Sequence, residues 1–306
     1  MNKWNRNQLA QVVTLYYEKN ISQKDISTIF RLSKMTISRM IQKAKELNII
    51  NIDIVLPFKI DEYLGKKIKK KYSIDEAIVV KKDVKKTISA LIGKVWAFYM
   101  GISDLNNKTI GLGLGNVVGS MVSYITPIKT RNTHIIQLMG GLTDVSETNP
   151  FWIVQEMCKK LKAEGTFLTS PATVSNEKTR NRIISSSYLS SIDLNNKCDM
   201  AIFGAGDIDA GVLLSQGLVK KEELKELKEK GGVGDILGHC FDKKGNFISS
   251  CIDKRLVSIP IDKLMSFKRR VCLAGGSVKR KSLKGALFSG IIDTIVCDEK
   301  LAQEII

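Results

Sequence analysis

Four segments that we expect to be strands are each followed directly by glycine. Glycine at the carboxyl end of a parallel strand lets backbone amides approach an anionic group, and the N-terminus of a following helix adds to the attraction. We therefore expect a binding site for a small anionic molecule at these strand ends. Its expected backbone contacts are Gly111, Gly113, Gly115, Asn116, Gly140, Gly141, Gly204, Gly206, Gly275 and Gly276.

Two charged residues accompany these glycines. Asp235 lies in the glycine-rich segment 231–238, which we expect to be a loop and where a carboxylate would accept hydrogen bonds from sugar hydroxyls. Its alternative role is to cap the turn. Lys279 begins an expected helix three residues after Gly276. A cation at that position opposes the helix dipole, so a bound anion explains it better than helix stability does. We expect both side chains to contact the ligand.

A second group of polar and basic residues lies near the start of the chain. Two short helices are expected there, from about residue 22 and over 34–47, joined by a three-residue turn. Small hydrogen-bonding and basic side chains in the first turns of the second helix suit the major groove of DNA. The expected DNA contacts are Ser22, Gln23, Ser33, Lys34, Thr36, Ser38, Arg39 and Lys43. The alternative is the solvated face of an ordinary helical bundle.

Met35 stands among these polar residues. The helical pattern leaves two possibilities open for it: burial inside the bundle, or contact with a thymine methyl group.

The charge distribution agrees with an anionic partner for this end of the chain. The 306 residues contain 48 Lys or Arg and 31 Asp or Glu, a net charge of +17. Residues 1–60 contain 10 Lys or Arg and 4 Asp or Glu, so the basic excess per residue is about twice that of the remainder. Such a balance is compatible with DNA, RNA or an acidic membrane surface, and charge alone does not choose among them.

Metal, cofactor and catalytic sites are not expected. None of the six cysteines forms a C-x-x-C pair, and the only histidines are His134 and His239. A dinucleotide loop requires a third glycine where this chain has Asn116. His134 lies inside an apolar strand and His239 beside Cys240, so we interpret both as structural. The enzymatic alternative, a sugar-phosphate isomerase or deaminase with a basic appendage, needs a positioned general base.

The sequence predicts a cytoplasmic protein with no membrane partner. Its most apolar stretch, residues 90–102, is interrupted by Lys94 and is shorter than the ~18 residues of a membrane span. Residues 1–20 contain Trp4, Arg6 and Gln8 where a signal peptide would be apolar.

Beyond the first helices the pattern changes to short apolar strands alternating with helices. This order is typical of a mainly parallel, doubly wound α/β domain. A short strand is expected at 50–54, before Pro57, where we place a boundary between domains 1–57 and 58–306. The strands of the second domain are expected at 77–80, 108–111, 134–138, 200–203, 256–259, 270–274 and 294–297.

These motifs, in this order, resemble the SorC/DeoR-type sugar-sensing transcriptional regulators along nearly the whole chain. The resemblance rests on Ser22-Gln23-Lys24-Asp25-Ile26, residues 36–44, Gly140-Gly141, Ser170-Pro171-Ala172, residues 233–238, Ala274-Gly275-Gly276 followed by Lys279, and residues 295–299.

The resemblance implies a plain or winged helix-turn-helix joined to an effector domain similar in fold to glucosamine-6-phosphate deaminase and ribose-5-phosphate isomerase. It also implies a sugar phosphate as effector, and a homo-oligomer, dimer or tetramer, on a palindromic double-stranded operator. In that family hydroxyl residues of the first glycine loop hold the phosphate, whereas Gly113 and Val117 take their places here. Two alternatives follow. The effector is a sugar phosphate whose phosphate group is held by backbone amides and Lys279, or the effector is not phosphorylated.

Overall fold

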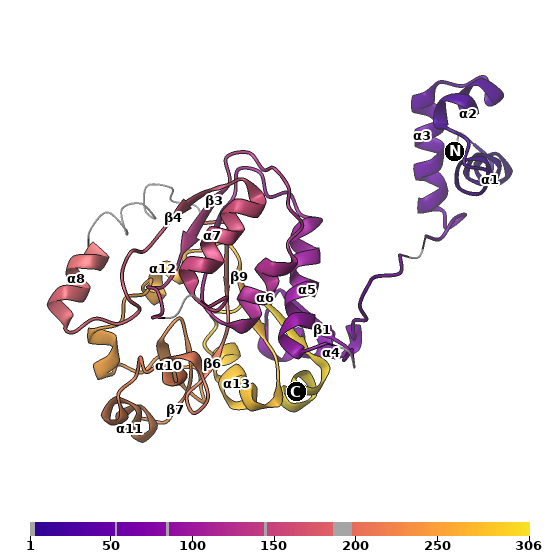
Figure 1. Ribbon diagram of the computed structural model, residues 1–306. Helices are drawn as coiled ribbons and strands as arrows, with labels where there is room; N and C mark the ends of the chain where they lie inside the picture. Colours follow the sequence, from indigo (N-terminus) through magenta and orange to yellow (C-terminus); the bar gives the residue numbers. More distant parts are fainter. Residues whose placement is uncertain (1–3, 53, 84–85, 144–145, 186–197) are drawn as a thin grey trace. The chain divides into compact units, whose positions relative to one another are not determined.

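The computed structural model describes residues 4–52, 54–83, 86–143, 146–185 and 198–306, in two compact units (Figure 1). The first unit ends at Pro57 and the second begins at Phe58. Each unit has a core of its own, so each is described separately.

The first unit is a small helical bundle. It contains α1 (Arg6–Val13), a π-helical turn η1 (Thr14–Glu18), α2 (Gln23–Phe30) and α3 (Lys34–Glu46). Both α1 and α2 pack on α3. The apolar residues repeat at helical spacing, so one face of each helix is buried in a common core of Leu9, Val12, Val13, Ile26, Ile37, Met40, Ile41 and Ala44.

Serine side chains begin both helices of the helix-turn-helix. The Ser22 hydroxyl accepts a hydrogen bond from the Asp25 amide (3.2 Å), and the Ser33 hydroxyl accepts one from the Thr36 amide (3.1 Å). Each bond satisfies a helix amide that has no partner within the helix. Arg31, at φ 53°, ends α2 in the left-handed conformation and turns the chain toward α3.

The expected strand at 50–54 is wrong. Residues 50–52 and 54 belong to no strand, and the described part of the first unit has none, so no wing is present there. Alternating apolar residues become a strand only where another strand offers hydrogen bonds and a surface to cover. Here Ile54 and Val55 remain 78% and 95% exposed.

The second unit is built on a seven-stranded sheet in the order β1-β10-β9-β5-β2-β3-β4, with every neighbouring pair parallel. The strands are β1 (Glu76–Val80), β2 (Thr109–Leu112), β3 (His134–Gln137), β4 (Glu164–Thr166), β5 (Met200–Phe203), β9 (Arg270–Ala274) and β10 (Thr294–Asp298).

Helices cover the sheet on both faces. On one face Val79, Phe203 and Cys297 share a core with residues of α4 (Glu62–Tyr72), α13 (Arg280–Phe288) and α14 (Glu299–Ile305). The alternate residues Ile202 and Val296 point the other way and are equally buried. There α5 (Ile88–Gly101), α6 (Asn116–Tyr124) and α7 (Pro150–Leu161) contact the strands. The expected doubly wound α/β class is confirmed.

A small antiparallel sheet and several short helices complete this unit. The second sheet has the order β6-β7-β8, with β6 (Gly206–Asp207), β7 (Gly232–Ile236) and β8 (His239–Asp242). The other helices of the described residues are α8 (Glu177–Ser185), α10 (Val212–Ser215), α11 (Lys221–Glu229), α12 (Ile261–Met265) and the 3-10 turns η2 (Cys251–Lys254) and η3 (Ser277–Lys279). None of the described helices is long and apolar enough to cross a membrane.

One of the seven expected strands of this unit is wrong. Residues 256–259 are almost completely buried but form only isolated bridges, Leu256 with Thr173 and Ser258 with Met139. Burial alone makes such a segment apolar, so its composition resembles that of a strand. The other six segments correspond to β1, β2, β3, β5, β9 and β10.

Candidate functional site

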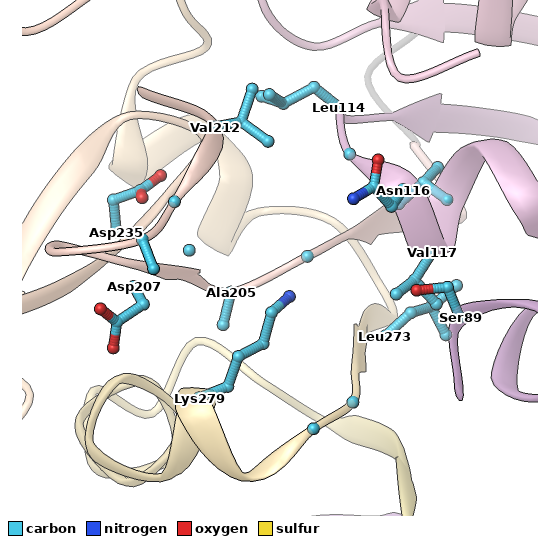
Figure 2. Close-up of a pocket in the computed structure, with 18 of the residues that line it drawn as sticks. Ser89, Leu114, Asn116, Val117, Ala205, Asp207, Val212, Asp235, Leu273 and Lys279 are labelled. Carbon is cyan, nitrogen blue, oxygen red and sulfur yellow. The ribbon is translucent and has the colours of Figure 1, made fainter. Parts of the chain in front are cut away.

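A cavity of about 380 Å³ opens at the carboxyl ends of β2, β5 and β9 (Figure 2). Its walls include residues 114–118, 204–207, 275–276 and 278–279 of the segments that follow these strands, together with Asp235 from β7 and Ser89 from the start of α5. This edge is where parallel α/β sheets bind ligands, because loops and helix N-termini converge there.

Eight of the twelve expected ligand contacts line this cavity. They are Gly115, Asn116, Gly204, Gly206, Asp235, Gly275, Gly276 and Lys279. The polar side chains of the wall are Ser89, Asn116, Asp207, Asp235 and Lys279, and the other side chains are apolar. Most ligand pockets have this composition, with a few polar groups fixing the orientation of the ligand.

The other four expected contacts lie outside the cavity wall. A Cβ on Gly111 or Gly113 would come within 2.6 Å of the Leu138 or Leu237 side chain, and one on Gly140 within 2.4 Å of the Pro171 carbonyl oxygen. These three glycines are required for close packing. Gly141 pairs with Pro171 in an isolated bridge. A glycine that lets backbone approach a ligand and one that lets two segments pack closely look identical in sequence.

Lys279 extends into the cavity, with its amino group directed toward the space between the walls (Figure 2). Among the described residues its Nζ has no hydrogen-bond or ion-pair partner. Burial lowers the pKa of Lys279, and the nearby Cys272, Asp235 and Asp207 act in the opposite direction. An anionic ligand would supply a direct ion-pair partner for this amino group.

Asp235 lies on a strand, not in the expected loop. It pairs with Cys240 across the antiparallel β7–β8 ladder, and its side chain is buried. One carboxylate oxygen accepts a hydrogen bond from the Gly238 amide (3.0 Å), so it also caps the turn. Burial raises the pKa of Asp235 to about 6, although the Gly238 amide and the Lys279 charge oppose the shift.

The N-terminus of α6 presents unbonded amides to the cavity. Its cap residue, Gly115, has φ 116° and supplies no side chain to the helix end. The amides of Asn116, Val117 and Val118 have no acceptor among the residues that the structure describes, and all three residues line the cavity. Such amides together with the helix dipole attract a negative group.

Three polar residues at the site were not expected from the sequence. Asp207 and Ser89 line the cavity, and the buried Asp298 supports its wall by accepting a hydrogen bond from the Gly276 amide (2.7 Å). Asp207 follows Gly206 directly, a signal that could have been used. Ser89 is brought there only by the packing of α5, and nothing in its local sequence marks it.

The two histidines are engaged elsewhere. His134, at the amino end of β3, has Nε2 2.7 Å from the Thr166 hydroxyl. His239 has Nε2 2.9 Å from the Ile259 carbonyl oxygen, and its Nδ1 faces Asp253. Neither lines the cavity, and the described residues include no cluster of three metal-ligating side chains.

In the first unit, helix α3 contains five of the eight expected DNA contacts. Lys34, Ser38 and Arg39 are exposed, and their side chains bond to no described residue. The Thr36 hydroxyl lies 2.9 Å from the Ser33 hydroxyl, so it also supports the start of the helix. Lys43 is paired with Glu46 at 2.8 Å. Ser22 caps α2, and Gln23 is half-buried in its first turn.

A family model described as "putative sugar-binding domain" matches residues 57–306. The chain belongs to this family. Over 98% of its length it is 25% identical to the uncharacterized transcriptional regulator YjhU of Escherichia coli K12, covering 94% of that protein. Over 97% of its length it is 26% identical to the deoxyribonucleoside regulator of Bacillus subtilis, covering 96% of it.

The fold agrees with a solved structure along the whole chain. The full-length sorbitol operon regulator SorC of Klebsiella pneumoniae matches 97% of this chain and 98% of its own, with a TM-score of 0.71 at 23% identity. All three proteins are named as regulators, YjhU as a transcriptional regulator, and none is named as an enzyme. The resemblance to SorC/DeoR-type regulators is thereby confirmed.

Proposed function

We propose that this protein is a DNA-binding transcriptional regulator of a carbohydrate-related operon, and that a small sugar effector controls its affinity for DNA. Residues 1–57 would bind operator DNA, and residues 58–306 would bind the effector and form the oligomer. The protein would act in the cytoplasm, where its operator lies.

One observation carries this proposal. The chain combines two parts. One is a helix-turn-helix whose second helix exposes basic and hydroxyl side chains that have no partner among the described residues. The other is a domain of the sugar-binding family with polar side chains in the wall of its cavity. A recognition helix needs free Arg and Ser side chains to reach base edges. The similarity to two proteins named as regulators, which extends over nearly the full length of this chain, supports the regulator function.

The effector is proposed to be a sugar phosphate. Its hydroxyls would donate to the Asp235 carboxylate, and its anionic group would lie near Lys279 and the free amides of α6. Sugars and sugar phosphates share the hydroxyl chemistry, so comparing the two forms of one sugar tests the role of the phosphate.

The DNA-binding part is proposed to act as a pair. Two copies of α3 reach half-sites about one DNA turn or a multiple apart, which a homodimer or tetramer provides on a palindromic operator. Effector binding would change the placement of the subunits, so that the two helices fit or miss their half-sites.

The test is binding of the full-length protein, at fixed salt, to DNA from around its own gene, with and without a panel of sugars and their phosphates. Salt is held constant because a protein of net charge +17 binds any duplex at low ionic strength. We expect sequence-specific binding that one of these compounds changes. Binding that is only salt-sensitive and indifferent to sequence would overturn the proposal.

Matched variants separate the two activities. Arg39→Ala should weaken binding to the specific site at least tenfold, because a base contact is lost, whereas Arg6→Ala removes the same charge from exposed α1 and should have little effect.

Lys279→Ala should weaken the effector response about tenfold without changing DNA affinity in the absence of effector. Lys281→Ala, exposed and outside this cavity, is its control.

A further inference from the structure

Met35 is a large apolar side chain that the first unit leaves in solvent. It occupies the second position of α3 and is 65% exposed. The residues that bury this helix are Ile37, Met40, Ile41 and Ala44. Met35 therefore contributes little to the core, and the packing of the unit does not explain it.

Its position on the helix is informative. Ser38, Arg39 and Gln42 follow Met35 by three, four and seven residues, so the four side chains form one stripe along α3. All four are exposed. Met35 is the only apolar member of the stripe, and it lies one turn before Arg39, close to the end of the helix that enters the groove first.

Only an apolar group on a base edge offers a favourable contact to an exposed methionine side chain. In the major groove thymine presents a C5-methyl group, whereas the other base edges present hydrogen-bond donors and acceptors. A thioether chain has no hydrogen to donate and packs readily on an apolar surface of irregular shape.

We infer that Met35 selects the operator sequence by packing against a thymine methyl group in each half-site. This inference rests on the proposed DNA-binding function and adds to it the base that one position reads. Arg39, on the next turn of the same stripe, would contact a neighbouring base pair.

The test uses duplexes selected by the full-length protein from a random library. In the enriched site each thymine is replaced in turn by uracil, which removes the methyl group and keeps both hydrogen-bonding edges. Because burying one methyl group contributes about as much as a fourfold change in affinity, we expect one thymine per half-site to show about a fourfold loss.

The variant Met35→Ala should bind the thymine duplex more weakly than the natural chain and should no longer distinguish thymine from uracil at that position. Met35→Leu should keep the discrimination. Ile29→Ala removes another exposed apolar side chain, 58% exposed on α2, and should leave the uracil profile unchanged. Since Met35 is exposed, its replacement should not alter the thermal unfolding of the protein, which circular dichroism checks.

Two results would overturn the inference while leaving DNA binding in place: a natural chain indifferent to every uracil, or a Met35→Ala variant as sensitive as the natural chain. Failure of the library to yield any enriched sequence would instead overturn the regulator function, and the base contact with it.

Discussion

At the scale of single residues, the ionised Asp235 carboxylate lowers the stability of the folded chain while providing a hydrogen-bond acceptor for a ligand. Its buried carboxylate has a pKa of about 6, compared with an ordinary value of 3.8, because burial disfavours the charge. Each pKa unit corresponds to about 1.4 kcal/mol, so the ionised carboxylate costs the fold on the order of 3 kcal/mol at pH 7. A ligand that donates hydrogen bonds to this group would recover part of that cost.

The variant Asp235→Asn should therefore be more stable and less responsive. Its free energy of unfolding at pH 7 should exceed that of the natural chain by up to about 3 kcal/mol, and its effector response should weaken about tenfold. Urea unfolding followed by tryptophan fluorescence measures the first quantity, and effector titration of DNA binding measures the second. Asp262→Asn, at an exposed position, should change neither.

The pH dependence of this effect has a defined sign. In the folded chain Asp235 keeps its proton up to about pH 6, whereas in the unfolded chain it loses it near pH 3.8. The folded state binds more protons in that interval, so the stability contributed by Asp235 falls as the pH rises through it. The gap between the variant and the natural chain should open between about pH 4 and pH 6. A gap that is the same at pH 4 and pH 7 would contradict the shift.

The charged residues of the site could be predicted from the sequence more readily than the secondary structure that holds them. Asp235 is recognisable as a charge among glycines and Lys279 as a cation at the start of a helix, and both line the cavity. The strand that holds Asp235 could not be foreseen, since β7 pairs with β6 and β8 through a segment rich in glycine, a weak strand former.

At the scale of elements, the pairing of β6 with β7 fixes the carboxylate wall of the cavity. Gly206 pairs with Asp235 in the antiparallel register, and a Cβ on Gly206 would lie 2.0 Å from the Asp235 Oδ1 atom. The carboxylate thus occupies the space that any side chain at position 206 would take.

Replacing Gly206 by alanine should consequently displace the Asp235 carboxylate. We expect the effector response to weaken at least tenfold, while specific DNA affinity without effector stays within about twofold, because the first unit does not contain this contact. Gly101→Ala is the matched control, since a Cβ there meets no atom within 4 Å. An unchanged effector response in Gly206→Ala would show that the carboxylate does not contact the effector.

Strands that contain a run of apolar residues could be predicted from the sequence, whereas very short or glycine-rich strands could not. Strands β1, β9 and β10 have five residues each and contain three or four consecutive apolar residues packed between the two helix layers, and such runs are recognisable. By contrast β4 has three residues and β6 has two, too few to show any period. The stretch at 50–54 has the period of a strand, but its described residues, 50–52 and 54, pair with no strand.

At the scale of the whole molecule, the positive charge is spread over both units and is densest in the first. Contacts to phosphates and contacts to bases should respond differently to salt. Each phosphate neutralised contributes about −0.9 to the slope of log affinity against log salt concentration, whatever the sequence.

The variant Lys34→Ala should weaken binding to specific and non-specific DNA alike and reduce the magnitude of that slope by about one for each bound copy of α3. Arg39→Ala should instead weaken the specific site preferentially. Filter binding or fluorescence anisotropy at four salt concentrations separates the two patterns. A Lys34→Ala variant that keeps the full slope would remove this lysine from the phosphate contacts.

The strand order has a consequence for the synthesis of the protein. Within the described sheet, β1 pairs with β10 alone, and Glu76 lies opposite Thr294. At 5–20 residues per second a ribosome needs roughly 10–40 s to make the intervening chain, and β1 has no strand to join during that time. The helical bundle at the start has every contact of its own core long before then. Each new molecule therefore completes first the helical bundle that we propose binds DNA, and the cavity of the second unit takes shape only after nearly the whole chain has been translated.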